Sequence, residues 1–386
     1  MSFLSQIIVA RATLYAFAAM GVLWGAYAAL IPDTKAMLGA GDAAFGSLIL
    51  ATPIAATTTM LIAPRLARSL GQHVLPMACL ALALAFVLPG WLAQPALFAL
   101  AMVFVGSANG FLDVTMNARV SAIEADTGLH LMNLNHAAYS FAYAAAAILT
   151  GTARDAGWHP GAVMSVAACI VALGAGLAIE GGQGVNGFAR SRRVVGRLGM
   201  LPVWGGLIAM IAFMAENASE NWSALHIERT LGGSKHEGSF GPAVLALTMG
   251  VGRVFGQMVI ANVDEGRMMR WGAVIAAIGT AVVGLAPTPA VAYAGLIVAG
   301  LGGSVLAPNV FAVVGRLSPP DLRAHMIARA TALGYMGYFF GPPALGFLSE
   351  GLGLAYALVA MAGVILLILV LYPRLIAAAA TGRHKT

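Results

Sequence analysis

Charged side chains are scarce in this sequence. Of its 386 residues, 9% are Asp, Glu, Lys or Arg and 60% are hydrophobic. A soluble domain carries about 25% charged residues, because its surface must be wetted. This chain has too little charge to cover a surface in water, so we expect lipid to cover most of it. The composition predicts an all-α integral membrane protein with many crossings.

Several functional signatures are also missing. The two cysteines, Cys79 and Cys169, lie in apolar runs and form neither a metal-binding pattern nor a disulfide framework. The chain contains no GxxxxGK[ST] phosphate loop, no HExxH and no nucleophile elbow. We therefore expect no enzyme, no ATP-driven pump, no cofactor and no metal. The net charge of +6 does not indicate a nucleic-acid partner, because the basic residues are not gathered on a soluble module.

Long apolar segments fill most of the chain. A membrane-spanning helix needs about 20 mostly apolar residues. Gaps between charges and turn signals predict twelve spans, with Pro287-Thr-Pro289 dividing the ninth from the tenth. Their approximate bounds are 10–31, 44–63, 73–92, 96–120, 132–152, 159–179, 200–222, 240–262, 270–286, 290–314, 327–348 and 353–373.

The spans fall into two similar halves. A polar, glycine-rich and basic stretch follows Glu180, so we expect six-helix bundles at 1–180 and 200–386 joined by a cytoplasmic linker at 181–199. Gly106-Ser-Ala-Asn-Gly110 in the fourth span resembles Gly300-Leu-Gly-Gly-Ser304 in the tenth. This internal likeness favours a duplicated transporter architecture.

The basic residues predict the orientation. With the N-terminus inside, 16 of the 21 Lys and Arg residues lie on inner segments, and four lie in outer loops: Lys35, Arg154, Arg229 and Lys235. Positive residues favour the cytoplasmic side. We expect a monomer in a bacterial inner membrane with both termini in the cytoplasm. Trp91, Trp158 and Trp222 fall near span ends and are expected to anchor at the interface.

At this point the chain resembles the major facilitator superfamily over nearly its whole length. The residues that carry this are the loops Pro64–Gly71 and Asp264–Arg270 and, within spans, Leu23–Gly25, Gly110–Asn117 and Leu134–Phe141. The last three look most like the branch of fucose permease and rhizopine-transporter-like proteins. The resemblance implies the two-bundle fold, a small-molecule substrate and proton coupling.

This resemblance also implies a role for one carboxylate. Asp113 occupies the place of an acidic residue that takes part in proton coupling in fucose permease. Two features depart from the family pattern. Ala67 stands where the first loop is usually acidic, and no carboxylate precedes Asp33 late in the first span. Neither the two-carboxylate scheme nor fucose as substrate is carried over.

Ionisable residues inside spans are the candidates for proton coupling, because each costs at least about 2.5–3.5 kcal/mol at a helix centre. Asp113 lies well inside the fourth span, and Glu216 and Glu220 share one face of the seventh. Two carboxylates so close favour a shared proton. His136 in the fifth span is a candidate proton relay, because a histidine side chain ordinarily titrates near neutral pH. The structural alternatives are hydrogen bonding between helices for Asp113, an outer-surface position for Glu220 and a wetted histidine.

Other polar residues inside spans are candidates for binding the substrate. Arg253 must find a carboxylate or face water, and its partner is Asp113, Glu216 or an anionic substrate; a static ion pair is the alternative. His136, Tyr139 and Tyr143 form a stripe along one helix face. The remaining candidates, each of which could instead bridge or pack helices, are Trp24, Asn109, Asn117, Asn217, Asn221, Gln257, Asn309, Tyr335 and Tyr338.

These residues predict a function. We expect a secondary transporter that moves a small polar solute by alternating access, with the substrate at mid-membrane and protons as the coupling ion. Carboxylates, amides, a histidine and an arginine with few aromatic residues favour a sugar, cyclitol or amino sugar. An efflux pump for amphipathic compounds, which needs a larger aromatic cavity, and a receptor that does not transport are the alternatives.

Overall fold

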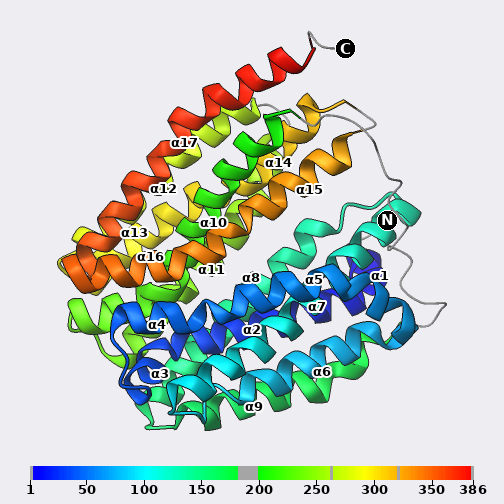
Figure 1. Cartoon of the computed structure of the whole chain (residues 1–386). Coiled ribbons are helices and arrows are strands. Elements are labelled where there is room, and N and C mark those ends of the chain that lie inside the picture. The colour runs from blue at the N-terminus through cyan, green and yellow to red at the C-terminus, as the bar shows by residue number, and fades with distance from the viewer. Residues whose placement is uncertain (1–2, 181–198, 261–263, 320–321, 384–386) are drawn as a thin grey trace.

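A computed structural model describes residues 3–180, 199–260, 264–319 and 322–383, and within these ranges every regular element is a helix. The helices form two halves that lie side by side (Figure 1). This confirms the predicted all-α fold of twelve crossings in two six-helix halves.

The first half contains six crossings. In chain order they are α1 (Phe3–Val9) with α2 (Arg11–Ala29), α4 (Asp42–Ile49) with α5 (Ala51–Leu70), α6 (Val74–Val87), α7 (Pro95–Thr127), α8 (Met132–Asp155), and α9 (Pro160–Gly174) with the 3-10 turn η2 (Ala175–Ala178). The short helix α3 (Ile31–Met37) links the first crossing to the second, and η1 (Gly71–His73) links the second to the third.

The second half repeats this arrangement. Its crossings are α10 (Leu201–Leu225), α11 (Lys235–Ile260), α12 (Glu265–Leu285), α13 (Pro289–Gly303) with α14 (Leu306–Leu317), α15 (Arg323–Gly334) with α16 (Met336–Leu352), and α17 (Leu354–Arg383). A single π-helical turn, η3 (His226–Thr230), extends α10. The boundary between the halves stays a prediction, because most of the expected linker at 181–199 lies outside the described residues.

Nine segments of the described chain are long and apolar enough to cross a membrane. One of them, Asp42–Val87, holds two crossings. The other two crossings are α8 and the α15–α16 pair, which carry polar side chains such as His136 and Tyr335. The hydropathy of these crossings is lowered by residues that face the protein interior, as the functional site shows below.

Two breaks between consecutive helices lie next to proline. Pro32 follows the break between α2 and α3, and Pro308 lies in the first turn of α14, just after the break at Ser304 and Val305. Proline has no N–H to donate, and its ring clashes with the carbonyl four residues earlier. The backbone leaves the regular helical path at Leu30, two residues before Pro32, and at Ser304, one turn before Pro308.

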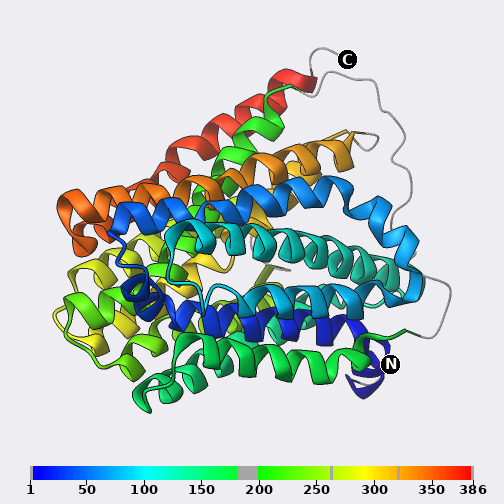
Figure 2. The same cartoon turned by 60° about the horizontal axis from the view of Figure 1, so that its bottom comes forward.

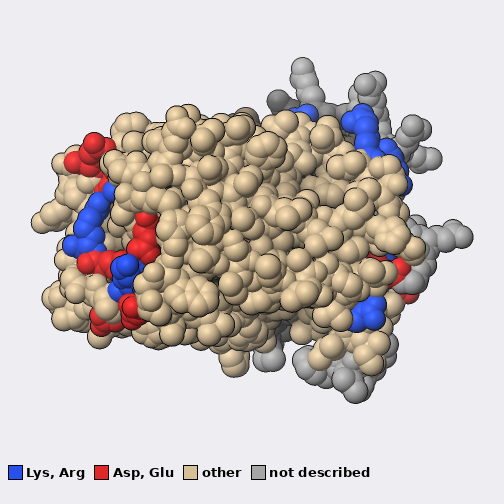
Figure 3. All heavy atoms as spheres, turned by 90° about the horizontal axis from the view of Figure 1, so that it is seen from below, with Lys and Arg blue, Asp and Glu red and all other residues tan. Residues whose placement is uncertain are grey.

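The two ends of the molecule differ. The helix α1 of the first half and the end of α17 of the second half lie at the same end of the molecule, here called the terminal end, while α3 and the start of α4 lie at the opposite, distal end (Figures 1 and 2). Most of the face seen in Figure 3 carries no charge between the two ends. This uncharged band is the surface that lipid is expected to cover.

Helices of the two halves pack closely near the distal end. A Cβ atom at Gly46 of α4 would lie 2.5 Å from the carbonyl oxygen of Pro342 in α16, and one at Gly346 would lie 2.5 Å from that of Asp42. Only glycine permits such an approach. The α4–α16 contact is therefore a tight seam that joins the halves.

Trp222 corrects one prediction. Its side chain is 1% exposed and packs against Phe45 of the other half, with ring centroids 6.4 Å apart. It belongs to a buried cluster in the second half and not to the membrane interface. Trp91 and Trp158 are half exposed, as an interfacial position requires. Sequence position near a span end could not distinguish the outward face of a helix from the inward one.

Candidate functional site

A cavity of about 820 Å³ lies between the two halves. Its walls come from α2, α5, α7 and α8 of the first half and from α10, α11, α14 and α16 of the second. The cavity reaches Met60 in the middle of α5 and Met132 at the first residue of α8, the end of that helix farthest from the distal residue Arg154. Its size falls in the usual range for small-molecule sites, roughly 300–1,000 Å³.

Fourteen of the fifteen predicted site residues line this cavity. They are Trp24, Asn109, Asp113, Asn117, His136, Tyr139, Glu216, Asn217, Glu220, Asn221, Arg253, Asn309, Tyr335 and Tyr338. The fifteenth, Gln257, lies in α11, and its side chain is outside the described part of the chain. The structure therefore gathers residues from distant parts of the sequence into one chamber, while their roles stay predictions.

Asp113 is held on the polar face of α7. Asn117, one turn later, donates from Nδ2 to the Asp113 carboxylate at 3.0 Å and to its backbone carbonyl at 2.8 Å. The Tyr335 hydroxyl of the other half donates to the second carboxylate oxygen at 3.5 Å. Asp113 is thus the acceptor in a weak contact that bridges the halves.

Arg253 pairs with Glu216. Its Nη2 lies 2.9 Å from Glu216 Oε1, and the two side chains are 20% and 18% exposed. Of the three partners that the sequence allowed, the structure selects this carboxylate. Both residues belong to the second half, on α11 and α10. The pair is therefore compatible with both predicted roles, as a structural ion pair or as part of the substrate site.

Glu220 stands one turn after Glu216 on α10 and lines the same cavity. The predicted shared face is confirmed, and the predicted outer-surface alternative is wrong, because Glu220 is only partly exposed and faces the chamber. Among the described residues, none donates a hydrogen bond to its carboxylate or forms an ion pair with it. The carboxylate is thus available to a solute.

The stripe on α8 is also confirmed. His136, Tyr139 and Tyr143 all line the cavity, and the two tyrosine ring centroids lie 5.8 Å apart. The His136 ring packs edge-on against Phe17 of α2, with centroids 4.9 Å apart. Two turns further along the same face of α2, Trp24 donates from its indole nitrogen to Asn109 Oδ1 at 2.7 Å. These contacts hold the polar face of the first half in place.

The expectation of few aromatic residues is wrong. Nine aromatic side chains line the cavity: Phe17, Trp24, Tyr27, Tyr139, Tyr143, Phe213, Phe311, Tyr335 and Tyr338. Phe213 stacks on Tyr338 and on Tyr335, with centroid distances of 5.0 and 5.7 Å. The rings come from helices far apart in the sequence, so no local pattern indicated that they would meet.

Several buried polar atoms of the cavity wall have no hydrogen-bond partner among the described residues. They are Tyr27 Oη, Thr52 Oγ1, Asn217 Oδ1 and Asn309 Oδ1. Asn309 is 1% exposed, and its Nδ2 donates to the Val305 carbonyl at 2.6 Å, which leaves the amide oxygen free. Buried polar groups are normally hydrogen-bonded. These atoms are enclosed within the wall of the cavity and do not open onto it.

Sequence reasoning missed a network of charges at the distal end. Arg154 of α8 has a side chain that is 0% exposed, and it donates to two carboxylates. Its Nε and Nη2 reach Asp33 of α3 at 2.7 and 3.1 Å, and its Nη1 and Nη2 reach Glu228 of η3 at 2.6 and 3.0 Å. Nη1 also donates to the Lys235 carbonyl at 3.0 Å and to Ser239 Oγ at 3.2 Å.

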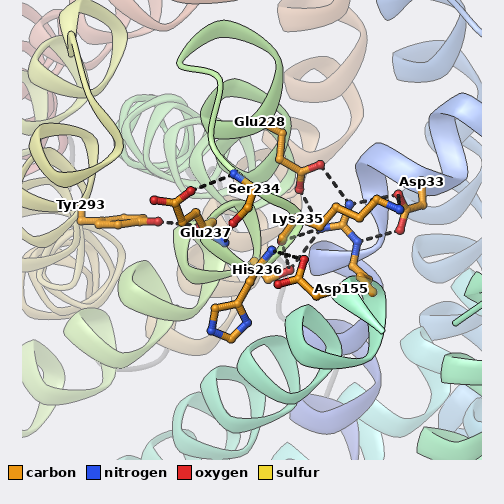
Figure 4. Close-up of polar contacts among 10 residues, drawn as sticks. Asp33, Asp155, Glu228, Ser234, Lys235, His236, Glu237 and Tyr293 are labelled. Atoms are coloured by element: carbon orange, nitrogen blue, oxygen red, sulfur yellow. Dashed lines mark hydrogen bonds and ion pairs between the residues drawn. The ribbon is translucent and has the colours of Figure 1, made fainter. Parts of the chain in front are cut away.

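This network joins the halves. Asp33 belongs to the first half and Glu228 to the second, and Figure 4 shows them reaching the network from different elements. Asp155 of the first half also accepts from the backbone N–H of His236 in the second, at 3.2 Å. A buried arginine with two bidentate carboxylates is a strong, geometrically specific link.

A second ionic cluster lies beside the first. Asp42 of the first half accepts from Nη1 and Nη2 of Arg229 at 2.7 and 2.6 Å, and Lys35 lies 3.0 Å from it. Ser349 of α16 makes a short hydrogen bond to Asp42. Glu350 accepts from the backbone N–H of Ala43 at 3.0 Å. Glu228 and Arg229, which are adjacent in η3, therefore bind the first half at two places, Arg154 and Asp42.

Ion pairs at the terminal end behave differently. Within the described residues they connect elements of one half, as in Arg119–Glu180 at 2.6 Å and Arg316–Glu265 at 2.8 Å. Among the described residues, the ion pairs that join the two halves all lie at the distal end. All four basic residues that the sequence assigns to outer loops belong to these clusters. Their positions in the sequence predict the topology but not their partners.

Comparison with known proteins agrees with this fold. A family model described as the Major Facilitator Superfamily matches residues 204–385. An uncharacterized MFS-type transporter of Yersinia pestis is 28% identical over 359 residues, covering 90% of this chain and 91% of that protein. Membrane protein MosC of Rhizobium meliloti is 24% identical over 355 residues, covering 90% and 85%. Neither relative is named as an enzyme.

Solved structures show the same architecture. A bacterial homologue of the human lysosomal transporter Spinster, in an inward-facing and occupied conformation, has a TM-score of 0.74 at 13% identity and covers 98% of both chains. A D-xylose-proton symporter has a TM-score of 0.72 at 16% identity, with 96% and 97% covered. The fucose:proton symporter of E. coli has a TM-score of 0.62 at 14% identity, with 96% and 99% covered.

Fold and cavity together define a multi-pass membrane protein with the major facilitator fold. Its resemblance to transporters of the major facilitator superfamily is confirmed by the matching family model and by relatives that align over 90% of the chain.

Proposed function

We propose that the protein is a secondary active transporter that moves a small polar solute (a sugar, cyclitol or amino sugar) by alternating access, coupled to protons. The observation that carries the proposal is the chamber between the halves, lined by Asp113 and closed at the distal end by ion pairs. Such a site at the interface of two repeats is where transporters of this kind bind their substrates.

The arrangement of the two ends supports one conformational state of the alternating-access cycle. Arg154, Glu228, Asp42 and Arg229 tie the halves at the distal end, and the cavity extends toward the terminal end. With both termini in the cytoplasm of a bacterial inner membrane, as the basic residues predict, this is an inward-facing state. Transport then requires the distal ion pairs to separate while the terminal end closes.

Asp113 is proposed as the proton carrier. As a carboxylate it accepts from Asn117 and from Tyr335 of the opposite half. A proton on Asp113 removes acceptor capacity from this site and so weakens the contact with Tyr335. Proton binding is thereby linked to the relative position of the halves, which is the link that coupled transport requires. Glu216, Glu220 and His136 are proposed to share or relay the proton.

The experiment is uptake by sealed proteoliposomes under an imposed pH gradient. Labelled sugars, cyclitols and amino sugars are screened together with a pH dye inside the vesicles. We expect one solute class to accumulate while protons move with it. Binding without any flux would instead identify a receptor, and flux without proton movement would remove the coupling from the proposal.

The aromatic lining favours a second candidate, export of amphipathic compounds. Nine aromatic rings around the cavity supply more apolar surface than the binding of a sugar requires. The same vesicles distinguish the two functions, because an exporter would move an amphipathic dye against its gradient and ignore small hydroxylated solutes. Competition between the dye and a sugar would show whether both use one site.

A further inference from the structure

We infer that the π-helical turn η3 changes shape when the distal end opens: the turn rewinds into an α-helix and so withdraws Glu228 and Arg229 from their partners in the first half. The inference rests on the alternating access of the proposed function. It adds a change of shape within the second half to the movement of the two halves, whereas a rigid second half would open with η3 unchanged.

The shape of η3 is not dictated by its own sequence. The segment His226-Ile-Glu-Arg-Thr230 contains neither glycine nor proline, which commonly interrupt helices. Among the described residues it is the only π-helical turn, and the Leu231 N–H donates across it to the His226 carbonyl at 3.2 Å. Such turns are rare and are often found at functional sites. We therefore expect contacts outside the segment to hold this shape.

The first half supplies such contacts. Arg154 donates to the two carboxylate oxygens of Glu228 at 2.6 and 3.0 Å, and Asp42 accepts from both Nη atoms of Arg229 at 2.7 and 2.6 Å. A π-helix holds more residues per turn than an α-helix, so rewinding rotates the later side chains further around the helix axis. The π-helical shape and the two ion pairs are therefore linked, because losing one displaces the other.

Polar atoms beside the turn lack partners in the present state. Trp222 Nε1, Ser223 Oγ and His226 Nδ1 are buried and have no hydrogen-bond partner among the described residues. His226 Nε2 lies 2.9 Å from the Val283 carbonyl, which only accepts, so in the neutral ring Nε2 carries the proton and Nδ1 is an acceptor. Buried polar groups are normally hydrogen-bonded. The closed distal end thus leaves this segment poorly satisfied, which favours a second arrangement of it.

The neighbouring chain has room for the change. A Cβ atom at Gly238 of α11 would overlap the Glu228 carboxylate, so glycine at this position admits the side chain. Directly after the turn, Gly232 has a φ of +70° and is followed by Gly233. Glycine adopts many backbone conformations without the steric cost of a Cβ atom. This short connection can therefore absorb a change in the length of the turn while α11 stays in place.

A disulfide within the second half tests whether η3 must change shape. A Cβ atom at Gly233 would lie 2.9 Å from Ile227 Cγ2, and the Gly233 N–H donates to the Ile227 carbonyl at 2.9 Å. Cysteines at these two positions are close enough for a disulfide that spans the turn. This cross-link does not join the two halves, and it leaves the residues of the ion pairs in place.

The measurement is the labelling of Ile49→Cys, a position that lines the cavity. An impermeant maleimide is added from the distal side of sealed vesicles, and mass spectrometry gives the rate of labelling at that position. Cys79 and Cys169 are replaced by alanine. In Ile227→Cys with Gly233→Cys we expect labelling to be several-fold slower after oxidation and to recover after reduction, because the oxidised turn cannot rewind.

The matched control is a second disulfide within the same half. A Cβ atom at Gly241 would lie 3.0 Å from Ser223 Cβ, so Ser223→Cys with Gly241→Cys links α10 to α11 before the turn begins. This cross-link should leave the labelling rate unchanged. Equal slowing by both disulfides would mean that any cross-link in this region restrains opening, and the inference would be wrong.

The opposite change forces the turn into an α-helix. Deletion of Thr230 removes one residue from the turn, and one glycine inserted after Gly233 keeps the connection to α11 at its original length. We expect faster labelling of Ile49→Cys, because Glu228 and Arg229 lose their partners. Circular dichroism and size-exclusion profiles check that the variant is folded. A folded variant that is labelled at the parent rate would contradict the inference.

The outcomes separate this inference from the proposed function. Labelling requires neither a transported solute nor a pH gradient, so it reports the opening of the distal end alone. Equal rates with and without the disulfide across the turn would show that the halves separate with η3 unchanged, which overturns the inference and leaves transport standing. If Ile49→Cys is not labelled even after reduction, the distal end does not open, which contradicts alternating access and the inference together.

Discussion

Protonation of Asp113 would change contacts with both halves of the molecule. Its carboxylate accepts from Asn117 on its own helix and from Tyr335 across the cavity. The carboxylate is thus held by one short local contact and one longer contact to the other half. The local contact fixes its position, and the longer one is free to change during transport.

The variant Asp113→Asn tests this position. Asparagine keeps the size of the side chain and one acceptor oxygen, but its amide nitrogen cannot accept a hydrogen bond and the side chain cannot carry the proton. We expect proton-driven accumulation to be lost, so that the solute reaches only its equilibrium level, while exchange of solute across the membrane continues. Uptake and counterflow in proteoliposomes measure the two activities. Accumulation at the wild-type level would remove Asp113 from the coupling mechanism.

The Arg253–Glu216 pair allows a stability test at the same scale. Removing one partner leaves a charge in a largely dehydrated site, so Arg253→Ala or Glu216→Leu alone should destabilise the fold by on the order of 3 kcal/mol. The double change Arg253→Met with Glu216→Leu should recover much of this loss. Thermal unfolding of the purified variants in detergent provides the measurement, and equal stability of the single and double variants would contradict the prediction.

At the scale of elements, η3 and α3 form the link between the halves. The π-helical turn places Glu228 and Arg229 next to each other, and their side chains reach two different partners in the first half, Arg154 and Asp42. The short helix α3 contributes Asp33 and Lys35 to the same two clusters. Two short elements thus hold the distal end closed.

Arg154→Ala should open this end. Without the guanidinium, Asp33 and Glu228 of opposite halves repel each other, so the balance shifts toward an outward-facing state. A cysteine at Ile49, which lines the cavity, reports the change through labelling by an impermeant maleimide added from the distal side, with Cys79 and Cys169 replaced by alanine. We expect labelling to become several-fold faster.

The matched control is Arg119→Ala. Arg119 also forms an ion pair, at 2.6 Å to Glu180, but both residues belong to the first half. Its loss should leave labelling at Ile49 unchanged. An equal response to both substitutions would show that the effect is a general loss of stability and not the release of a contact between halves.

At the scale of the whole molecule, transport requires the two halves to separate at the distal end in every cycle. The helices α8 and α11 cross there, and a Cβ atom at Gly151 would lie 2.8 Å from Ser239 Cβ. A small separation of the helices brings the two Cβ atoms to roughly 3.5–4.5 Å, the distance that a disulfide requires. The seam is therefore suited to a reversible cross-link.

The double variant Gly151→Cys with Ser239→Cys, without the native cysteines, should stop transport when oxidised and recover it when reduced. Solute binding to the oxidised protein in detergent should persist, because the cavity remains accessible from the terminal end. Each single cysteine variant serves as a control for the substitution itself. Full transport by the cross-linked protein would show that this seam does not open.

Much of this architecture could be predicted from local chemistry. The cost of placing a polar group in lipid belongs to each side chain, so composition and spacing alone predicted the membrane setting, twelve crossings and two halves. The same cost singled out Asp113, Glu216, Glu220 and Arg253, all of which line the cavity. Asn109 and Asn309, predicted as candidates because they are polar residues inside spans, line the same cavity.

The remaining features of the site depend on how the helices pack against one another. Which carboxylate pairs with Arg253, how nine rings converge on one cavity, and why Trp222 is buried all depend on distances between helices remote in the sequence. The distal charges show the same limit, since Arg154 is a loop-end arginine in the sequence and a fully enclosed link between halves in the fold. Hydropathy is a property of single residues, whereas a pairing exists only once both helices are in place.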